Sequence, residues 1–228
     1  MRRIVFAFCV AIVLPASNAH AADDLNSVLR KLDAAAANFH STSADFRFES
    51  VTTDPIPETE LQTGQVYYER KAKTFQMAAH IKEVDGKPVP KTYMFSGGEF
   101  KLWEGGALNT VTTFAKANKF ESYLMLGFGA SGTELADKWN ITYDGDETVD
   151  GVKTAKLELI AKDPGVRKNL PKVIVWMDTA RGISLKQYFD EGQGQSRTCT
   201  YSNIKLNQPL PGDAFTLPTN KSTQYVKR

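Results

Sequence analysis

The segment Lys73–Glu104, KTFQMAAHIKEVDGKPVPKTYMFSGGEFKLWE, decides the fold. Its apolar and polar residues alternate, and short turns interrupt the alternation at DGKP and at Gly97–Gly98. This pattern predicts antiparallel strands joined by tight hairpins. Similar stretches predict further strands at Ala44–Thr53, Thr63–Lys71, Trp139–Gly145, around the turn Asp150–Gly151, and at Leu170–Asp178, Gly182–Glu191, Ser196–Asn207 and Ala214–Leu217.

Three segments show a helical period instead. Residues 23–39 carry an apolar face at spacings of three and four, and residues 112–126 show a similar pattern. Ser131 and Glu134 have the spacing of a capping box, which predicts a short helix from Ser131 to about Trp139. Strands and helices do not alternate regularly, so the sequence predicts a mainly antiparallel β protein with α-helices.

The first 21 residues resemble a secretory leader. Arg2 and Arg3 precede the apolar run Ile4–Ala16, and Ala19–Ala21 fits a cleavage site. We expect residues 1–21 to be removed and residues 22–228 to form one domain, without a lipid on Cys9. Removing the two arginines cancels the net charge of +2, so nothing favours nucleic acid as a partner.

The stretch LMLGFGASG places Gly127, Gly129 and Gly132 in a G-x-G-x-x-G arrangement. A dinucleotide site requires this motif between a parallel strand and a helix. Here the glycines lie between two helical patterns in an antiparallel chain, so we expect no nucleotide and no other cofactor. A flexible joint between two helices is the simpler interpretation.

The sequence offers little for catalysis or metal binding. His40 and His80 have no ligand spacing with each other or with nearby acids, so no metal site is expected. No nucleophile elbow or catalytic triad stands out, and the expectation is a protein that is not an enzyme. Cys199, the one cysteine beyond the leader, reads as a packing residue in a strand.

Apolar residues occur on both faces of some strands. In VIVWM, Val173, Val175 and Met177 share one face, whereas Ile174 and Trp176 share the other. The segment Phe120–Ala130 is apolar on nearly every side, so it must also be buried. A curved sheet with helices in its hollow meets both demands, with either a packed core or a hydrophobic cavity beneath a helical lid.

We predict three groups of site residues from alternation and apolar character. The hollow is lined by Phe46, Phe48, Phe75, Tyr93, Phe95, Trp103, Trp176 and Phe189. The lid surface consists of Leu124, Met125, Leu126 and Phe128. The lid hinge consists of Gly127, Gly129 and Gly132, because a lid needs a flexible joint.

The order of these elements resembles the LolA family of periplasmic lipoprotein carriers and its outer-membrane lipoprotein-sorting relatives. The resemblance covers about residues 25–217, and it includes a strand with a glycine six residues before an arginine, a hairpin ending in tryptophan, and the helical insert. It implies an unclosed, strongly curved antiparallel sheet, a half-barrel whose hollow is covered by helices. It also implies that Arg70, six residues after Gly64, latches the lid.

The resemblance further implies a function. A monomeric periplasmic carrier would take acylated lipoproteins from an inner-membrane ABC exporter, shield their acyl chains and pass them to an outer-membrane receptor. A carrier or sensor of another envelope lipid, such as a phospholipid or glycolipid, remains open. A regulatory module of the same fold and an enzyme acting on lipids or envelope polymers also remain open.

Overall fold

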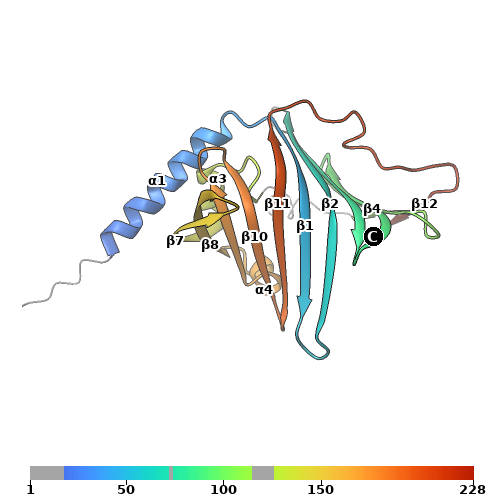
Figure 1. The fold of residues 1–228 in the computed structure, drawn as a ribbon, viewed down its shortest axis with the longest axis horizontal. Helices are drawn as coiled ribbons and strands as arrows, with labels where there is room; N and C mark the ends of the chain where they lie inside the picture. Colours follow the sequence, from blue (N-terminus) through green and yellow to red (C-terminus); the bar gives the residue numbers. More distant parts are fainter. Residues whose placement is uncertain (1–17, 72–73, 115–125) are drawn as a thin grey trace, which may run out of the picture.

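One large, unclosed sheet dominates the computed structural model, which describes residues 18–71, 74–114 and 126–228. Within these residues the strand order is β12-β6-β5-β4-β3-β2-β1-β11-β10-β9-β8-β7, and only the β12–β6 pair is parallel. Figure 1 shows the curvature, with the central strands β2, β1, β11 and β10 side by side. The strands are β1 (Ser41–Thr52), β2 (Glu58–Lys71), β3 (Thr74–Val84), β4 (Lys87–Ser96), β5 (Glu99–Glu104), β6 (Thr110–Phe114), β7 (Trp139–Val149), β8 (Val152–Ala161), β9 (Lys172–Asp178), β10 (Ile183–Gly192), β11 (Gln195–Leu206) and β12 (Gln224–Lys227).

Three helices accompany the sheet in the described residues: α1 (Asn18–Ala36), α3 (Gly132–Lys138) and α4 (Pro164–Asn169). Helix α1 lies at the β7–β8 end of the sheet (Figure 1). Its buried side chains Val28 and Leu32 join one apolar cluster with residues of α3 and of strands β7–β9. Helix α1 therefore covers that end of the concave face.

A second apolar cluster occupies the concave face of the central strands. It contains aromatic residues from β1, β2, β3, β4 and β11, among them Phe46, Tyr68 and Tyr201. Register shifts interrupt the ladder between Ser43 and Asp45 and again near Gly64. Such irregularities increase the local twist of a sheet, which helps the sheet to curve around this cluster.

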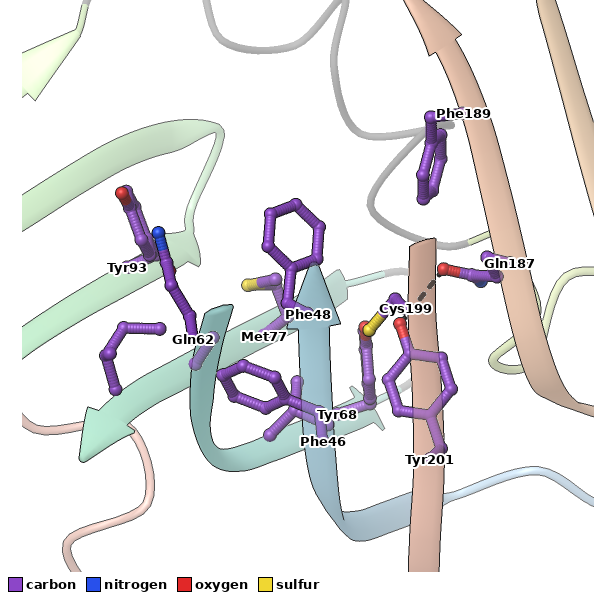
Figure 2. Close-up of a pocket in the computed structure, with 13 residues that line it drawn as sticks. Phe46, Phe48, Gln62, Tyr68, Met77, Tyr93, Gln187, Phe189, Cys199 and Tyr201 are labelled. Carbon is purple, nitrogen blue, oxygen red and sulfur yellow. Dashed lines mark hydrogen bonds between the residues drawn. The ribbon is translucent and has the colours of Figure 1, made fainter. Parts of the chain in front are cut away.

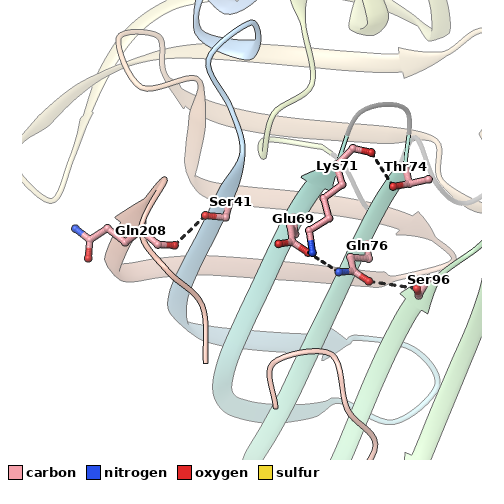
Figure 3. Close-up of polar contacts among 7 residues, drawn as sticks. All are labelled: Ser41, Glu69, Lys71, Thr74, Gln76, Ser96 and Gln208. Atoms are coloured by element: carbon pink, nitrogen blue, oxygen red, sulfur yellow. Dashed lines mark hydrogen bonds and ion pairs between the residues drawn. The ribbon is translucent and has the colours of Figure 1, made fainter. Parts of the chain in front are cut away.

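Polar side chains form part of the convex face. On β2, β3 and β4, Gln76 donates to the Glu69 carboxylate, Ser96 Oγ donates to Gln76 Oε1 at 3.3 Å, and Lys71 pairs with Glu69 at 3.1 Å (Figure 3). The hydroxyl of Ser41 donates to the carbonyl of Gln208 at 2.9 Å, where the C-terminal segment leaves β11. The convex face also carries buried apolar side chains, among them Trp103 and Val111, so only part of this face is polar.

The predicted fold class is confirmed: the chain is mainly β, with a curved, unclosed antiparallel sheet and a few helices. The predicted helix at Ser131 is also confirmed, because Ser131 and Glu134 form the reciprocal capping box of α3. Helix α1 runs through position 21, the expected end of the leader. No described helix combines the length and the apolar character that crossing a membrane requires.

Two expectations about elements were wrong, and one helix was missed. Residues 112–114 of the helix predicted at 112–126 instead belong to strand β6, because the β-branched run TVTTF pairs with β5, whereas residues 115–125 lie outside the described part of the chain. No strand forms at Ala214–Leu217, and the last strand is instead β12 at Gln224–Lys227. Helix α4 was missed, although Asp163 accepts from the backbone N–H groups of Gly165 and Val166 and Pro164 occupies its first turn.

Candidate functional site

The candidate site is an apolar cavity of about 190 Å³ on the concave face of the central strands. In Figure 2 the rings of Phe48 and Phe189 lie at one end of the group, and Tyr68 and Tyr201 lie at the other. The lining residues are Phe46, Phe48, Gln62, Val66, Tyr68, Met77, Ala79, Ile81, Tyr93, Gln187, Phe189, Cys199 and Tyr201.

Strand alternation explains why these side chains converge. Phe46 pairs with Tyr201 across β1 and β11, and Phe48 pairs with Cys199, so all four point to the same face. Residues between them, such as Arg47, therefore point to the convex face. The cavity is thus a direct product of the period of two in β1 and β11.

Among the residues that the structure describes, no charged side chain lines the cavity. Burial raises the pKa of the Cys199 thiol to about 12, and it also raises the pKa values of the Tyr68 and Tyr201 phenols well above their ordinary value. All three groups are therefore neutral at physiological pH. A general acid or base needs a pKa near the working pH, and none of these three groups provides one.

Phe128 forms the inner boundary of this apolar region. Its ring is fully buried, stacks on Tyr68 with centroids 4.2 Å apart and meets Tyr201 edge-on at 4.8 Å. Leu126 belongs instead to the cluster under α1, so the chain turns between the two apolar clusters at Gly127. We call residues 126–130 the plug segment.

A buried glutamine attaches the plug segment to the sheet. Gln187 Nε2 donates to the carbonyl of Leu126, and its Oε1 accepts from the Tyr201 hydroxyl at 2.9 Å. The backbone N–H of Ser184 donates to the carbonyl of Gly127 at 2.7 Å. The plug segment is therefore fixed to β10 by backbone and side-chain contacts together.

The three predicted hinge glycines are tightly packed in this structure. Gly127 and Gly129 have φ of +81° and +76°, which side-chain-bearing residues rarely adopt. A Cβ would lie 2.3 Å from Ser184 Cβ at Gly127, 2.4 Å from a ring carbon of Phe39 at Gly129, and 2.2 Å from the Leu29 carbonyl oxygen at Gly132. Close packing therefore accounts for the glycines without any motion.

Arg70 lies beside the helical insert, as the latch interpretation required. Its guanidinium is 3.5 Å from Glu134, the residue that also completes the capping box of α3. The backbone N–H of Arg70 donates to the His40 carbonyl at 2.8 Å. Arg70 thus links β2 to α3, although a role in opening stays a prediction.

The predicted lining and lid residues are found in several places. Phe46, Phe48, Tyr93 and Phe189 line the cavity. Phe75 and Phe95 are buried in the same cluster, with their rings 6.3 Å apart, but do not border the cavity. Leu126 and Phe128 belong to the plug segment, whereas Leu124 and Met125 lie outside the described residues.

Two predicted lining residues face the wrong way. Trp103 pairs with Thr92, whereas the cavity residue Tyr93 pairs with Leu102, so Trp103 lies on the convex face. Trp176 lies between Val175 and Met177 of the concave cluster and therefore also points outward. There the Lys186 ammonium sits 4.4 Å from its ring centroid. A register error of one residue produces this reversal.

The sequence analysis did not predict the other nine residues that line the cavity. Val66 and Tyr68 alternate with Gly64 along β2, and Tyr201 alternates with Cys199 along β11, so the strand period could have placed them. Gln187 gave no signal, because its role depends on a carbonyl 61 positions earlier in the chain. Among the described residues, no three His, Cys, Asp or Glu side chains cluster as a metal site.

Comparisons with known proteins agree with this architecture. No protein-family model matches the chain, and no curated protein sequence does either. Among solved structures, an uncharacterised conserved protein from Thermus thermophilus is similar with a TM-score of 0.56 and 10% identity, covering 90% of this chain and 99% of that one. MucB is similar with a TM-score of 0.54 and 13% identity, covering 86% of this chain and 63% of MucB.

The chain therefore spans about three fifths of the length of MucB. A putative outer membrane lipoprotein-sorting protein domain from Vibrio parahaemolyticus has a TM-score of 0.46 and 14% identity, with 86% of this chain and 97% of that chain covered. At these identities the likeness concerns the fold alone. The fold that this chain shares with the Thermus protein and MucB is the open, curved antiparallel sheet described above.

Proposed function

We propose that the protein is a carrier that shields the acyl chains of envelope lipids in its concave cavity. The observation that carries the proposal is the cavity itself, whose lining holds ten apolar or aromatic side chains, two glutamines and a neutral thiol. Sites of this kind bind through apolar surface and place few polar groups. An acyl chain fits this chemistry, because it needs no charged partner.

The size of the cavity sets a condition on binding. At about 190 Å³ it is smaller than the roughly 300–1,000 Å³ of typical small-molecule sites, so a whole long chain requires extra room. Phe128 occupies the adjoining space between Tyr68 and Tyr201. A lipid chain competes with this ring for the same apolar surroundings, which keeps affinity moderate and allows release.

Acylated lipoproteins are the proposed client. In this proposal the protein works in the periplasm as a monomer, receives lipoproteins from an inner-membrane ABC exporter and delivers them to an outer-membrane receptor. The LolA-like fold and the leader-like first 21 residues support this assignment. The proposal includes no catalytic step, and the neutral cavity lining supports that part.

A carrier or sensor of a different envelope lipid is the second candidate. The likeness to MucB, at a TM-score of 0.54, favours this second candidate, because another similar structure, with a TM-score of 0.50, is a MucA/MucB complex from Pseudomonas aeruginosa. Protein partners are thus compatible with a sheet of this kind. In either candidate the cavity holds an acyl chain, and the two differ in what is attached to it.

Native mass spectrometry of the protein isolated from its own cell envelope tests the proposal. We expect the wild type to carry an acylated polypeptide, and a bound phospholipid or glycolipid would select the second candidate. Ala79→Phe should abolish the bound mass, because Ala79 lines the cavity. Thr198→Phe, on the convex face of β11, is the matched control and should retain it. Equal ligand content in both variants, or none in the wild type, would contradict the proposal.

A further inference from the structure

A polar row borders the apolar cavity beyond Phe48, and we call this end of the cavity its mouth. Phe48 pairs with Gln62 on one side and with Cys199 on the other, and this row lines the cavity. Two residues further along β1, Ser50 pairs with Glu60 and with Arg197. The concave surface therefore changes from apolar to polar within one step of two residues.

Arg197 stands on the concave side of this row. It shares the alternation of the cavity residues Cys199 and Tyr201 along β11, and its register partner on β10 is the cavity residue Phe189. The guanidinium carbon is 5.8 Å from the centroid of the Phe48 ring. The cation thus lies against the Phe48 ring, beside the strand position of Phe189.

Glu191 orients this guanidinium and leaves part of it open. Arg197 Nε lies 2.9 Å from Glu191 Oε2, and this is the one ion pair of Arg197 within the residues that the structure describes. The contact uses one of five N–H donors, so the terminal Nη1 and Nη2 groups can still bind an oxyanion with two parallel hydrogen bonds. The Arg197 side chain is 47% exposed, which keeps that edge accessible.

Other charged groups near the mouth do not cancel this role. Glu60 lies two strands away from Arg197, roughly 10 Å at ordinary strand spacing, and its Oε1 accepts from Gln62 Nε2 at 2.6 Å. Solvent and salt screen exposed charges strongly at that separation. An oxyanion bound at Nη1 and Nη2 would lie much closer to the guanidinium than to Glu60.

We propose that Arg197 binds the oxyanion of an amphiphile whose acyl chain occupies the cavity. The ligand class is an acyl chain attached to a carboxylate or a phosphate, as in a free fatty acid or a phospholipid. The inference rests on the second candidate of the proposed function, a carrier or sensor of another envelope lipid, because it assigns the polar head of that ligand. Glu191 is a positioning residue that holds the guanidinium at the mouth.

Isothermal titration with short soluble amphiphiles tests the assignment. Dodecanoate and dodecanol share one chain and differ in charge, and lauroyl lysophosphatidate supplies the phosphate. Wild type should bind the anions about tenfold or more tightly than dodecanol, because hydrogen bonds to charged groups are the strong ones. Arg197→Gln should remove that preference and leave dodecanol binding unchanged. The tighter of the two anions identifies the carboxylate or the phosphate as the natural head.

Arg47→Gln is the matched control. Arg47, like Arg197, forms an ion pair, in this case with Glu49 of the same strand at 2.8 Å. Because Arg47 lies on the convex face, its substitution should not affect binding. Equal affinity for dodecanoate, lysophosphatidate and dodecanol in the wild type would overturn the Arg197 assignment while leaving the carrier proposal intact. An equal loss of preference in Arg47→Gln would also overturn it. Absence of binding by all three compounds would instead refute the carrier function itself.

Discussion

Phe128 provides the sharpest test of competition between the plug segment and a lipid. Its ring is fully buried between Tyr68 and Tyr201, so Phe128→Ala removes one stacked and one edge-on aromatic contact. Truncating a buried Phe to Ala costs roughly 3–5 kcal/mol of unfolding free energy. We therefore expect the empty variant to be less stable by about that amount.

The same substitution should strengthen lipid binding. The space left by the ring adjoins the cavity and admits about three additional methylene groups of an acyl chain. At ~0.8 kcal/mol per buried CH₂, this is worth roughly 2 kcal/mol, or about 30-fold in affinity. The variant thus exchanges an internal contact for a ligand contact.

Urea unfolding with and without an acyl ligand measures both effects. Leu157→Ala is the control, because Leu157 is fully buried in the cluster under α1 and does not line the cavity. It should lose roughly 2–5 kcal/mol without gaining affinity. The competition model is refuted when Phe128→Ala binds the ligand no more tightly than Leu157→Ala does.

Three further predictions follow from the same contacts. Gly127→Ala and Gly129→Ala should each destabilise the fold by more than Gly86→Ala in a thermal melt, because all three have positive φ but only the first two clash with Ser184 or Phe39; equal losses would mean that backbone strain alone matters. Between about pH 9 and pH 12 the free energy of unfolding should fall as the pH rises, since the Cys199 thiol ionises first in the unfolded chain while burial raises its folded pKa to about 12, and the buried Tyr68 and Tyr201 phenols, whose pKa values are also raised, act in the same direction; a denaturation series unchanged across that window would contradict this. The Arg70–Glu134 pair, 3.5 Å long with Glu134 half exposed, should couple by less than about 1 kcal/mol in a double-mutant cycle of Arg70→Gln and Glu134→Gln, and a larger value would indicate a stronger link than the geometry supports.

Elements with a strong local pattern could be predicted from the sequence. The hairpins of residues 73–104 depend on alternation and on Gly-bearing turns, and the capping box at Ser131 depends on neighbouring residues. Both signals are local, so both predictions were confirmed. The last three residues of the strand at Thr110–Phe114 were predicted as the start of a helix, because its β-branched residues act through pairing with β5.

The side-chain directions in the site were harder to predict. Trp176 and Val175 are adjacent, and the choice of the inner residue depends on which face α1 covers, a tertiary contact that alternation does not contain. Gln187 and the carbonyl of Leu126 meet although they are 61 positions apart in the chain. The glycines of the plug segment gave a clear signal, but the signal of close packing resembles that of a hinge.

The central claim is that an acyl chain occupies the concave cavity, and photolabelling tests it most directly. A fatty acid carrying a diazirine at its chain end is bound, irradiated and located by peptide mass spectrometry. The account predicts adducts on cavity residues such as Met77 and Cys199, suppressed by an excess of unlabelled fatty acid. Adducts confined to the convex face around Trp103 and Trp176, or labelling that unlabelled fatty acid does not suppress, would contradict it.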